Sequence, residues 1–307
     1  MLSMLKSTFN ISDSMAISKI LIDKEAQFSH LRQKYSHYAG CASHIDLRQV
    51  KNHLIVILTT QRTGSTLLCQ DIESSCRLSY SPTESFIPLL QGFSKCTIEP
   101  DEISNRIENI LQSFADQDLS VFKIMVDYIG WLGFFCADKD RALNWSYAQL
   151  SAFFIDKLKC IDPSKQCRFV RLDRKDKLKQ AVSRLINSMG LPTHIKTEAD
   201  ANHFEIQLSN KLAKYPNYHC MIIDQLGIIL RQLCILDDCL SRLANTELYC
   251  CYEFEDDLLE RKDIYLNNLL EGIDCQPSSI RRALKPTAGK RSREMLRNLL
   301  QIIGYIE

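Results

Sequence analysis

The sequence predicts an α/β protein built on a parallel β-sheet that is flanked by helices. Short apolar runs recur along the chain and are bounded by turn-forming residues, as buried parallel strands are. Segments with helical spacing lie between these runs, and this alternation is the pattern of a parallel sheet with helical crossovers. We expect the strands at residues 54–58, 121–126, 169–172 and 248–252.

The remaining segments complete this organisation in chain order. Residues 1–50 are polar and mixed, with helical spacing from about 13 to 38, so we expect an N-terminal helical extension before one α/β domain at 51–307. The apolar stretch CMIIDQLGIILRQLCIL (220–236) is interrupted by polar residues such as Asp224, which predicts a buried helix of a soluble protein and no transmembrane segment. Helices are expected at 65–75 and near 103–114, 144–158, 176–189, 203–212 and 220–244.

Composition narrows the functional classes. The chain has 307 residues, of which 45% are hydrophobic and 24% charged, as in an ordinary globular protein. Its formal net charge of +1 gives no general attraction to nucleic acid or to anionic membranes. The 13 cysteines are scattered without CxxC spacing, and the N-terminus lacks the apolar core of a signal peptide. We therefore expect a reduced, cytoplasmic protein whose cysteines are mostly small core residues and bind no metal.

A candidate anion-binding loop follows the first predicted strand, in TTQRTGSTLLCQ (59–70). A glycine turn between a strand and a helix directs backbone N–H groups toward an anion. The loop lacks the first glycine and the lysine of the usual P-loop, which disfavours an ordinary Mg-ATP enzyme. The alternative is a serine/threonine turn that caps a helix, with a surface arginine. The groups placed to bind an anion are the backbone at Thr63, Gly64, Ser65 and Thr66, two hydroxyls of the loop and the guanidinium of Arg62.

Two basic segments stand out in this nearly neutral chain. Residues 168–184 hold seven basic residues against two aspartates, and residues 281–297 hold seven against one glutamate. Together with the loop they suggest a ligand that carries more than one phosphate-like group. The alternative is that each segment is only a solvated helix face.

Three motifs in this order resemble those of PAPS-dependent sulfotransferases, most of all the bacterial trehalose 2-sulfotransferase-like family. PAPS is 3′-phosphoadenosine-5′-phosphosulfate. The motifs are TTQRTGSTLLCQDIESS (59–75), SPTESF (81–86) and RKDKLKQAVS (174–183), and a looser match lies at YEFEDDL (252–258). The resemblance implies a P-loop-like sulfotransferase fold and a sulfuryl transfer from PAPS that requires no metal.

The resemblance also implies roles for single residues. The loop with Arg62 would bind the 5′-phosphosulfate and stabilise charge on the departing phosphate, while Arg174 and Ser183 would bind the 3′-phosphate. Glu84 would be the catalytic base that accepts the proton of the acceptor hydroxyl, and Lys123 would lie near the donor. Pro82 and Phe86 would shape this site.

Each of these residues also has a purely structural alternative. Arg174 could be a surface charge at a helix start, and Ser183 an ordinary small helix residue. Ser81 and Glu84 have the S-x-x-E spacing of a helix capping box. Lys123 could extend its amine from the end of a strand to solvent.

The sequence leads us to expect a sulfotransferase that acts on a hydroxyl of a carbohydrate or small metabolite. Gln61 replaces the proline that the family usually has before the loop arginine, and the aromatic residues common after Ser183 are missing, so the acceptor half diverges. One alternative is a catalytically degenerate PAP-binding interaction protein. A less favoured one is an ATP/Mg-dependent kinase that uses Asp127. The family can form homodimers, and a basic C-terminal loop could close over the 3′-phosphate, with Lys285, Lys290, Arg291 and Arg293.

Overall fold

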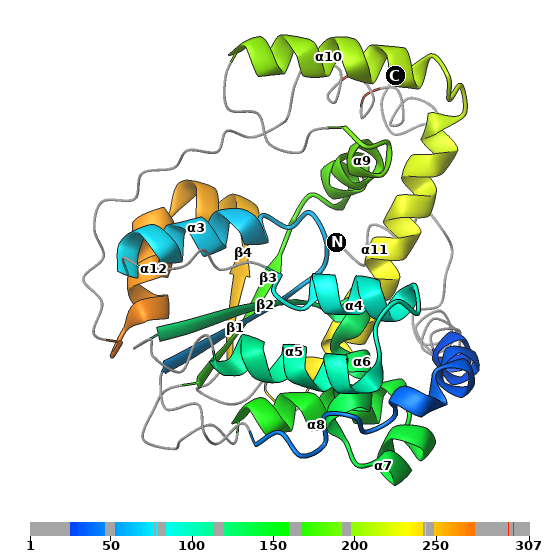
Figure 1. Ribbon diagram of the computed structural model, residues 1–307. Helices are drawn as coiled ribbons and strands as arrows, with labels where there is room; N and C mark the ends of the chain where they lie inside the picture. The colour runs from blue at the N-terminus through cyan, green and yellow to red at the C-terminus, as the bar shows by residue number, and fades with distance from the viewer. Residues whose placement is uncertain are drawn as a thin grey trace. The chain divides into compact units, whose positions relative to one another are not determined.

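A four-stranded, all-parallel sheet flanked by helices organises the protein (Figure 1). In this computed structural model, the strand order is β2-β1-β3-β4. The strands are β1 (His53–Thr59), β2 (Leu119–Met125), β3 (Cys167–Asp173) and β4 (Tyr249–Glu253). The residues that the structure describes are 25–46, 53–76, 78, 84–112, 119–159, 167–191, 198–241, 243, 249–273, 294 and 297.

The burial of the strands explains why they could be recognised from their apolar runs. Nearly all of β1 and every residue of β2 are buried, and β3 buries four of its seven residues. Such strands read as continuous hydrophobic segments because both of their faces are covered. The α/β class and the four predicted strands are confirmed. The order puts β1 and β3 in the centre of the sheet and β2 and β4 at its edges.

Helices connect the strands, and the segments predicted as helical after residue 50 are confirmed within the described residues. Of the stretch predicted at about 13–38, residues 25–34 are helical and residues before 25 lie outside the described part of the chain. Four further helices, α4, α6, α7 and α12, form where no helix was predicted. The described helices are α3 (Ser65–Cys76), α4 (Ile87–Ser94), α5 (Pro100–Gln112), α6 (Ile129–Cys136), α7 (Lys139–Asn144), α8 (Tyr147–Lys159), α9 (Lys177–Ser188), α10 (Glu198–Leu212), α11 (Tyr218–Leu240) and α12 (Lys262–Leu270), with 3₁₀ turns η1 (Ser36–Tyr38) and η3 (Val126–Tyr128) and a π-helical segment η4 (Phe254–Glu260).

The chain divides into two compact units. Unit 1 comprises Met1–Leu58, Thr83–Val170 and Arg231–Cys250, and unit 2 comprises Thr59–Pro82, Arg171–Leu230 and Cys251–Glu307. The carboxyl ends of β1, β3 and β4 therefore belong to unit 2. The predicted boundary between an N-terminal extension and a single domain, at residue 50, stays a prediction.

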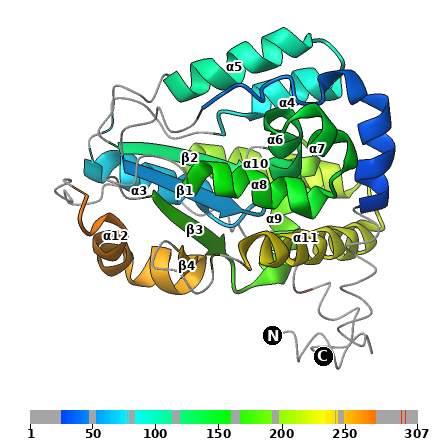
Figure 2. The same cartoon turned by 90° about the horizontal axis from the view of Figure 1, so that it is seen from below.

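The core of unit 1 depends on close packing between α6 and α8, which lie side by side (Figure 2). A Cβ atom added at Gly133 of α6 would lie 2.1 Å from the carbonyl oxygen of Leu150 in α8, so only glycine allows this approach. Seven of the eight residues of α6 are buried. A helix that is apolar on all sides has no 3.6-residue pattern, which explains why the sequence did not predict it.

The described part of the predicted N-terminal extension packs in unit 1. The ring of Phe28 lies 4.8 Å from that of Trp131, measured between centroids, and 5.2 Å from that of Tyr147. The backbone N–H of Tyr147 donates to Glu25 Oε2 at 2.7 Å. These contacts bury the ring of Phe28 almost completely, so residues 25–46 contribute to the core of this unit.

Helix α11 is long and apolar enough to cross a membrane by length and composition. A core helix of a soluble protein passes the same test, so one such helix is a weak indication either way. About a third of its most apolar 18-residue window is buried. Two of its polar side chains have partners, because Gln225 accepts from Arg184 Nε at 3.2 Å and Gln232 donates to Asp127.

In unit 2, α12 lies beside α3, the helix that begins at the candidate loop (Figure 1). The hydroxyl of Tyr265 in α12 donates to the carboxylate of Asp71 in α3. Asp71 is fully buried and Tyr265 is 2% exposed. A buried carboxylate is costly unless hydrogen bonds compensate for the lost hydration, so this bond stabilises the packing of the two helices.

We predict that Tyr265→Phe lowers the free energy of unfolding by about 1–3 kcal/mol, because Asp71 loses a buried donor. Urea denaturation followed by circular dichroism measures the change. Tyr215→Phe is the matched control, since Tyr215 is 42% exposed and should change stability by less than about 0.5 kcal/mol. Equal effects of the two substitutions would show that the buried bond contributes nothing specific.

Candidate functional site

The loop between β1 and α3 has an unusual backbone. Arg62 has a φ of 66° and Gly64 a φ of 91°, so two residues within three positions adopt the left-handed conformation. This conformation is ordinary for glycine and costs free energy for arginine. The carbonyl of Gly64 accepts from Leu68 N at 3.1 Å, which begins the helix at Ser65. Strained backbone at a strand end motivates a functional hypothesis.

A glutamine from α9 holds this loop in place. Gln180 is fully buried, and its Nε2 donates to Thr60 Oγ1 at 2.9 Å and to the Gln61 carbonyl at 2.7 Å. Thr63, also fully buried, donates from Oγ1 to the Thr60 carbonyl at 3.2 Å. These bonds satisfy the carbonyl groups on one side of the loop and fix its shape.

The other side of the loop presents donors. Within the described residues, the backbone N–H groups of Gly64 and Ser65 donate no hydrogen bond. Thr66 follows in the first turn of α3, so the loop and the start of the helix form one surface. Free N–H groups at a helix N-terminus bind anions through hydrogen bonds and the helix dipole. The predicted anion-binding groups are therefore brought together.

Arg174 follows directly after β3 and reaches the same loop. Its Nη1 donates to the carbonyl of Arg62 at 3.3 Å, and its Nε donates to Glu255 Oε1 at 3.2 Å. The side chain of Arg62 in turn donates from Nε to Ser183 Oγ in α9 at 2.9 Å. The structure thus joins Arg62, Arg174 and Ser183 in one cluster of unit 2. In the sequence-based prediction, Arg62 belongs to the 5′-phosphosulfate site and the other two residues belong to a separate 3′-phosphate site.

The electrostatics of this cluster favour an anion. Burial, and then the nearby positive charge of Arg174, lower the pKa of the Arg62 guanidinium. Two guanidinium groups that repel each other are stabilised when an anion lies between or beside them. Arg174 uses two of its five N–H donors, and the other three have no partner among the described residues.

Glu84 and Lys123 form a second cluster, which belongs to unit 1. Lys123 Nζ lies 2.9 Å from Glu84 Oε1, and the two side chains are 7% and 18% exposed. The structure therefore brings together the predicted base and the predicted lysine of β2 in a mostly buried ion pair. The proposed capping box is wrong for Glu84, because α4 begins only at Ile87 with Phe86 as its N-cap. Ser81 and Pro82 lie outside the described residues.

A tyrosine that sequence reasoning missed lies near this ion pair. The hydroxyl oxygen of Tyr128, in the turn after β2, is buried and has no hydrogen-bond partner among the described residues. Burial, and then the negative charge of Glu84, raise the pKa of this hydroxyl. Asp127 is the neighbouring acid, and it accepts a hydrogen bond from Gln232.

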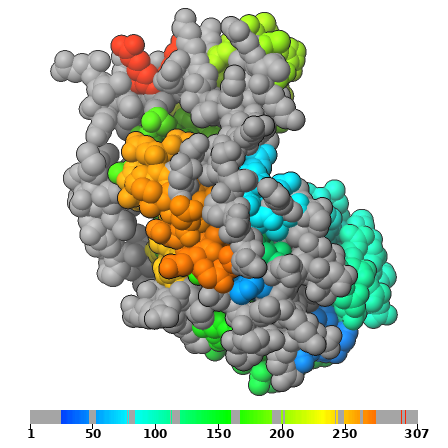
Figure 3. All heavy atoms as spheres, turned by 90° about the vertical axis from the view of Figure 1, so that its left-hand side faces the viewer, coloured from blue at the N-terminus to red at the C-terminus, as the bar shows by residue number. Residues whose placement is uncertain are grey.

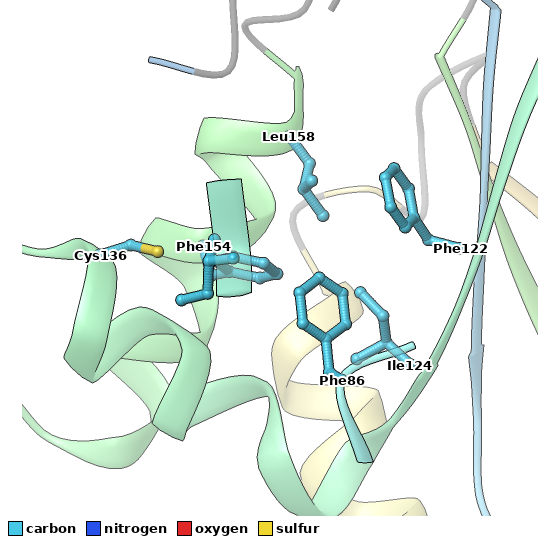
Figure 4. Close-up of a pocket in the computed structure, with 7 residues that line it drawn as sticks. Phe86, Phe122, Ile124, Cys136, Phe154 and Leu158 are labelled. Atoms are coloured by element: carbon cyan, nitrogen blue, oxygen red, sulfur yellow. The ribbon is translucent and has the colours of Figure 1, made fainter. Parts of the chain in front are cut away.

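Phe86 lies in the apolar core of unit 1, and its predicted role in shaping the site stays a prediction. Its ring lies 6.2 Å from that of Phe122 and 6.5 Å from that of Phe154. Figure 4 shows these rings turned toward a small cavity. The side chains around it offer no hydrogen-bonding group beyond a thiol, so it suits neither water nor a polar ligand. The lining residues are Phe86, Ile107, Phe122, Ile124, Cys136, Phe154 and Leu158.

Three residues that shape the anion-binding cluster were not predicted as site residues. Gln180 lies in the motif RKDKLKQAVS, and its burial beside the loop carbonyls could not be inferred from spacing. Phe254 and Glu255 lie in the looser match at 252–258, where no residue was assigned a role. The basic residues Lys285, Lys290, Arg291 and Arg293 lie outside the described residues, so the predicted C-terminal closure stays a prediction.

No protein-family model matches this chain, and no curated protein or solved structure matches it significantly. The membership suggested by the three motifs therefore stays a prediction. The structure shows how the residues of these motifs are arranged, and it does not test the family membership. Among the described residues, no group of three or more histidine, cysteine, aspartate or glutamate side chains is arranged to hold a metal ion.

We predict that Gly64→Ala destabilises the protein more than Gly190→Ala does. Both glycines have a left-handed φ, 91° and 71°. A Cβ at Gly64 would lie 2.1 Å from Cδ2 of Phe254, whereas a Cβ at Gly190 would meet no atom of the described residues within 4 Å. Backbone strain should cost each variant about 1–2 kcal/mol, and overpacking should cost Gly64→Ala about 1–3 kcal/mol more.

Chemical denaturation of both variants and the wild type measures these differences in the free energy of unfolding. Because the backbone penalty is common to the two variants, their difference isolates the contact with Phe254. Identical unfolding free energies for the two variants would contradict the close packing of Phe254 on the loop.

Proposed function

We propose that this protein is a PAPS-dependent sulfotransferase that transfers a sulfuryl group to a hydroxyl of a carbohydrate or small metabolite. The observation that carries the proposal is the joining of Arg62, Arg174 and Ser183 around a loop in which the N–H groups of Gly64 and Ser65 have no partner among the described residues. We further propose that the α/β fold is the P-loop-like fold of sulfotransferases. The loops after the central strands β1 and β3 hold the site, and ligands of open α/β sheets bind at such carboxyl ends.

The residues of the cluster fit a ligand with several negative charges. The N–H groups of Gly64 and Ser65 and the first turn of α3 would bind the 5′-phosphosulfate. The guanidinium of Arg174 and the hydroxyl of Ser183 would bind the 3′-phosphate. Arg62 donates to Ser183 and is near Arg174, so it would neutralise charge on the phosphate that departs. PAPS supplies the sulfuryl group when bound.

We assign the proton transfer to the Glu84–Lys123 pair, on the basis of the motif resemblance. The carboxylate of Glu84 would accept the proton of the acceptor hydroxyl while the acceptor oxygen forms its bond to sulfur and the bond from sulfur to the phosphate oxygen breaks. Lys123 Nζ holds Oε1 of Glu84 at 2.9 Å, which leaves Oε2 for the acceptor. Products are a sulfate ester and 3′,5′-ADP (PAP), and the proton remains on Glu84 until solvent removes it.

The experiments described below also distinguish the proposed function from two alternatives. A kinase would bind ATP with Mg²⁺ and would use Asp127. A degenerate interaction protein would bind PAP without turnover. Cytoplasmic localisation and a homodimeric state are expectations from the sequence and its resemblance, and they remain so.

Arg174→Ala should weaken PAP binding by about 1.5–3 kcal/mol, because a charge-assisted phosphate contact is lost. Isothermal titration calorimetry with PAP in EDTA measures this, and ATP with Mg²⁺ is the competing ligand. Lys175→Ala is the matched control, since this neighbour is an exposed lysine whose ion pair is with Asp256. Tighter binding of ATP with Mg²⁺ than of PAP by the wild type would contradict the proposal and favour a kinase.

Glu84→Gln should slow transfer about 10²–10⁴-fold and leave PAP affinity unchanged, because the base is lost and the donor site is intact. PAP release from PAPS in the presence of trehalose and a panel of simple sugars measures the rate. Glu102→Gln is the control in the same unit, where Glu102 forms an exposed ion pair with Arg106. A wild-type rate in Glu84→Gln would remove Glu84 from the mechanism. PAP binding by a wild type that turns over no sugar would favour the interaction protein.

A further inference from the structure

The segment that follows β4 carries a second set of residues for the anion-binding cluster. Phe254–Glu260 forms a π-helix, η4, in unit 2. Figure 3 shows η4 and α12, in orange, on one face of the molecule. π-helical turns are rare and occur frequently at functional sites. The first two residues of η4 both contact Arg174.

Glu255 accepts hydrogen bonds from the side chain of Arg174 and from the backbone N–H of the next residue. Its Oε1 accepts from Arg174 Nε at 3.2 Å, and its Oε2 accepts from the backbone N–H of Lys175 at 2.7 Å. The side chains of Arg174 and Glu255 are 17% and 26% exposed, so this ion pair is mostly removed from solvent. One carboxylate therefore holds both the guanidinium and the backbone that carries it.

The aromatic ring of Phe254 also contacts the guanidinium of Arg174. Arg174 Cζ lies 5.2 Å from the centroid of the Phe254 ring, at cation–π distance. The ring also lies against Gly64, where an added Cβ would come within 2.1 Å of Cδ2. Phe254 thus packs between the arginine and the loop, and it couples the position of one to that of the other.

These contacts leave one part of the guanidinium available. Glu255 occupies Nε, and the Arg62 carbonyl occupies one N–H of Nη1. The two N–H groups of Nη2 and the second of Nη1 have no partner among the described residues. They form the end of the guanidinium fork, which is the edge that binds two oxygens of one phosphate.

We propose that Glu255 and Phe254 are positioning residues that hold the fork of Arg174 for the 3′-phosphate, and so set the preference for nucleotides that carry one. This inference rests on the proposed function. Holding the side chain before binding removes the entropy cost of ordering a long arginine when the ligand arrives. The preference should disappear if Arg174 is free to move.

Positioning by Glu255 and electrostatic repulsion by Glu255 predict opposite changes in nucleotide affinity when its charge is removed. The negative charge of Glu255 repels any anion bound nearby, so a carboxylate that merely competes for Arg174 would weaken nucleotide binding. Its removal would then tighten binding. Positioning predicts the opposite result, and salt separates the two effects because it screens the repulsion between charges and leaves the arginine's conformational freedom unchanged.

The test is isothermal titration of Glu255→Gln with PAP and with 5′-AMP, which lacks the 3′-phosphate, at about 0.5 M salt, where the Debye length is roughly 4 Å. PAP affinity should fall about three- to tenfold and 5′-AMP affinity should not change. Asp256→Asn is the matched control, because Asp256 lies next in η4 and pairs only with exposed Lys175 among the described residues. It should bind both nucleotides as the wild type does.

Phe254→Leu is the second variant, since it changes no charge and keeps an apolar side chain against Gly64. Its PAP affinity should also fall about threefold with 5′-AMP unaffected. In an Arg174→Ala background, Glu255→Gln should have no further effect, because there is no guanidinium left to hold. Thermal denaturation of each variant establishes that it is folded.

Unchanged or tighter PAP binding by Glu255→Gln would overturn the inference, and so would an equal loss for 5′-AMP or an effect that persists without Arg174. These results are distinct from a failure of the proposed function. In that case the wild type itself would bind neither nucleotide, and the inference would fall with it.

Discussion

The site depends on the placement of two arginines, Arg62 and Arg174, at the carboxyl ends of neighbouring strands. Two guanidinium groups held this close repel each other, and the pKa of Arg62 is lowered first by burial and then by the positive charge of Arg174. The fold maintains this arrangement by binding each arginine to a partner, Ser183 for Arg62 and Glu255 for Arg174. A polyanionic ligand would relieve the repulsion, and this is the physical basis for proposing that the cluster recognises phosphate.

The loop can hold the two arginines in place because several hydrogen bonds and packing contacts fix its backbone conformation. The left-handed φ of Arg62 turns its carbonyl toward Arg174 while its side chain reaches Ser183. Gln180 donates a hydrogen bond to the carbonyl of Gln61, the preceding residue, and Phe254 packs against Gly64. Strain at Arg62 is tolerated because hydrogen bonds and packing on both sides exclude the alternatives. By contrast, a Cβ atom at Gly190, which also has a left-handed φ, would meet no described atom within 4 Å.

The elements that could be predicted were those whose signal is local. The strand β1 and the turn at Gly64 follow from an apolar run and a glycine. The helix α6 was missed because it is buried on all sides and so lacks a helical period. Glu255 was missed because it lies 81 residues from Arg174 in the sequence. Such partners depend on tertiary structure, which spacing does not encode.

The central claim is that the cluster formed by the loop, Arg174 and Ser183 binds a nucleotide with phosphates at both the 5′ and 3′ positions. A crystal structure of the protein with PAP, grown in EDTA, tests this most directly. The account predicts the 5′-phosphate on the N–H groups of Gly64 and Ser65, and the 3′-phosphate on the fork of Arg174, with Glu255 still bonded to Nε. A nucleotide bound elsewhere, or a 3′-phosphate that makes no contact with Arg174, would contradict it.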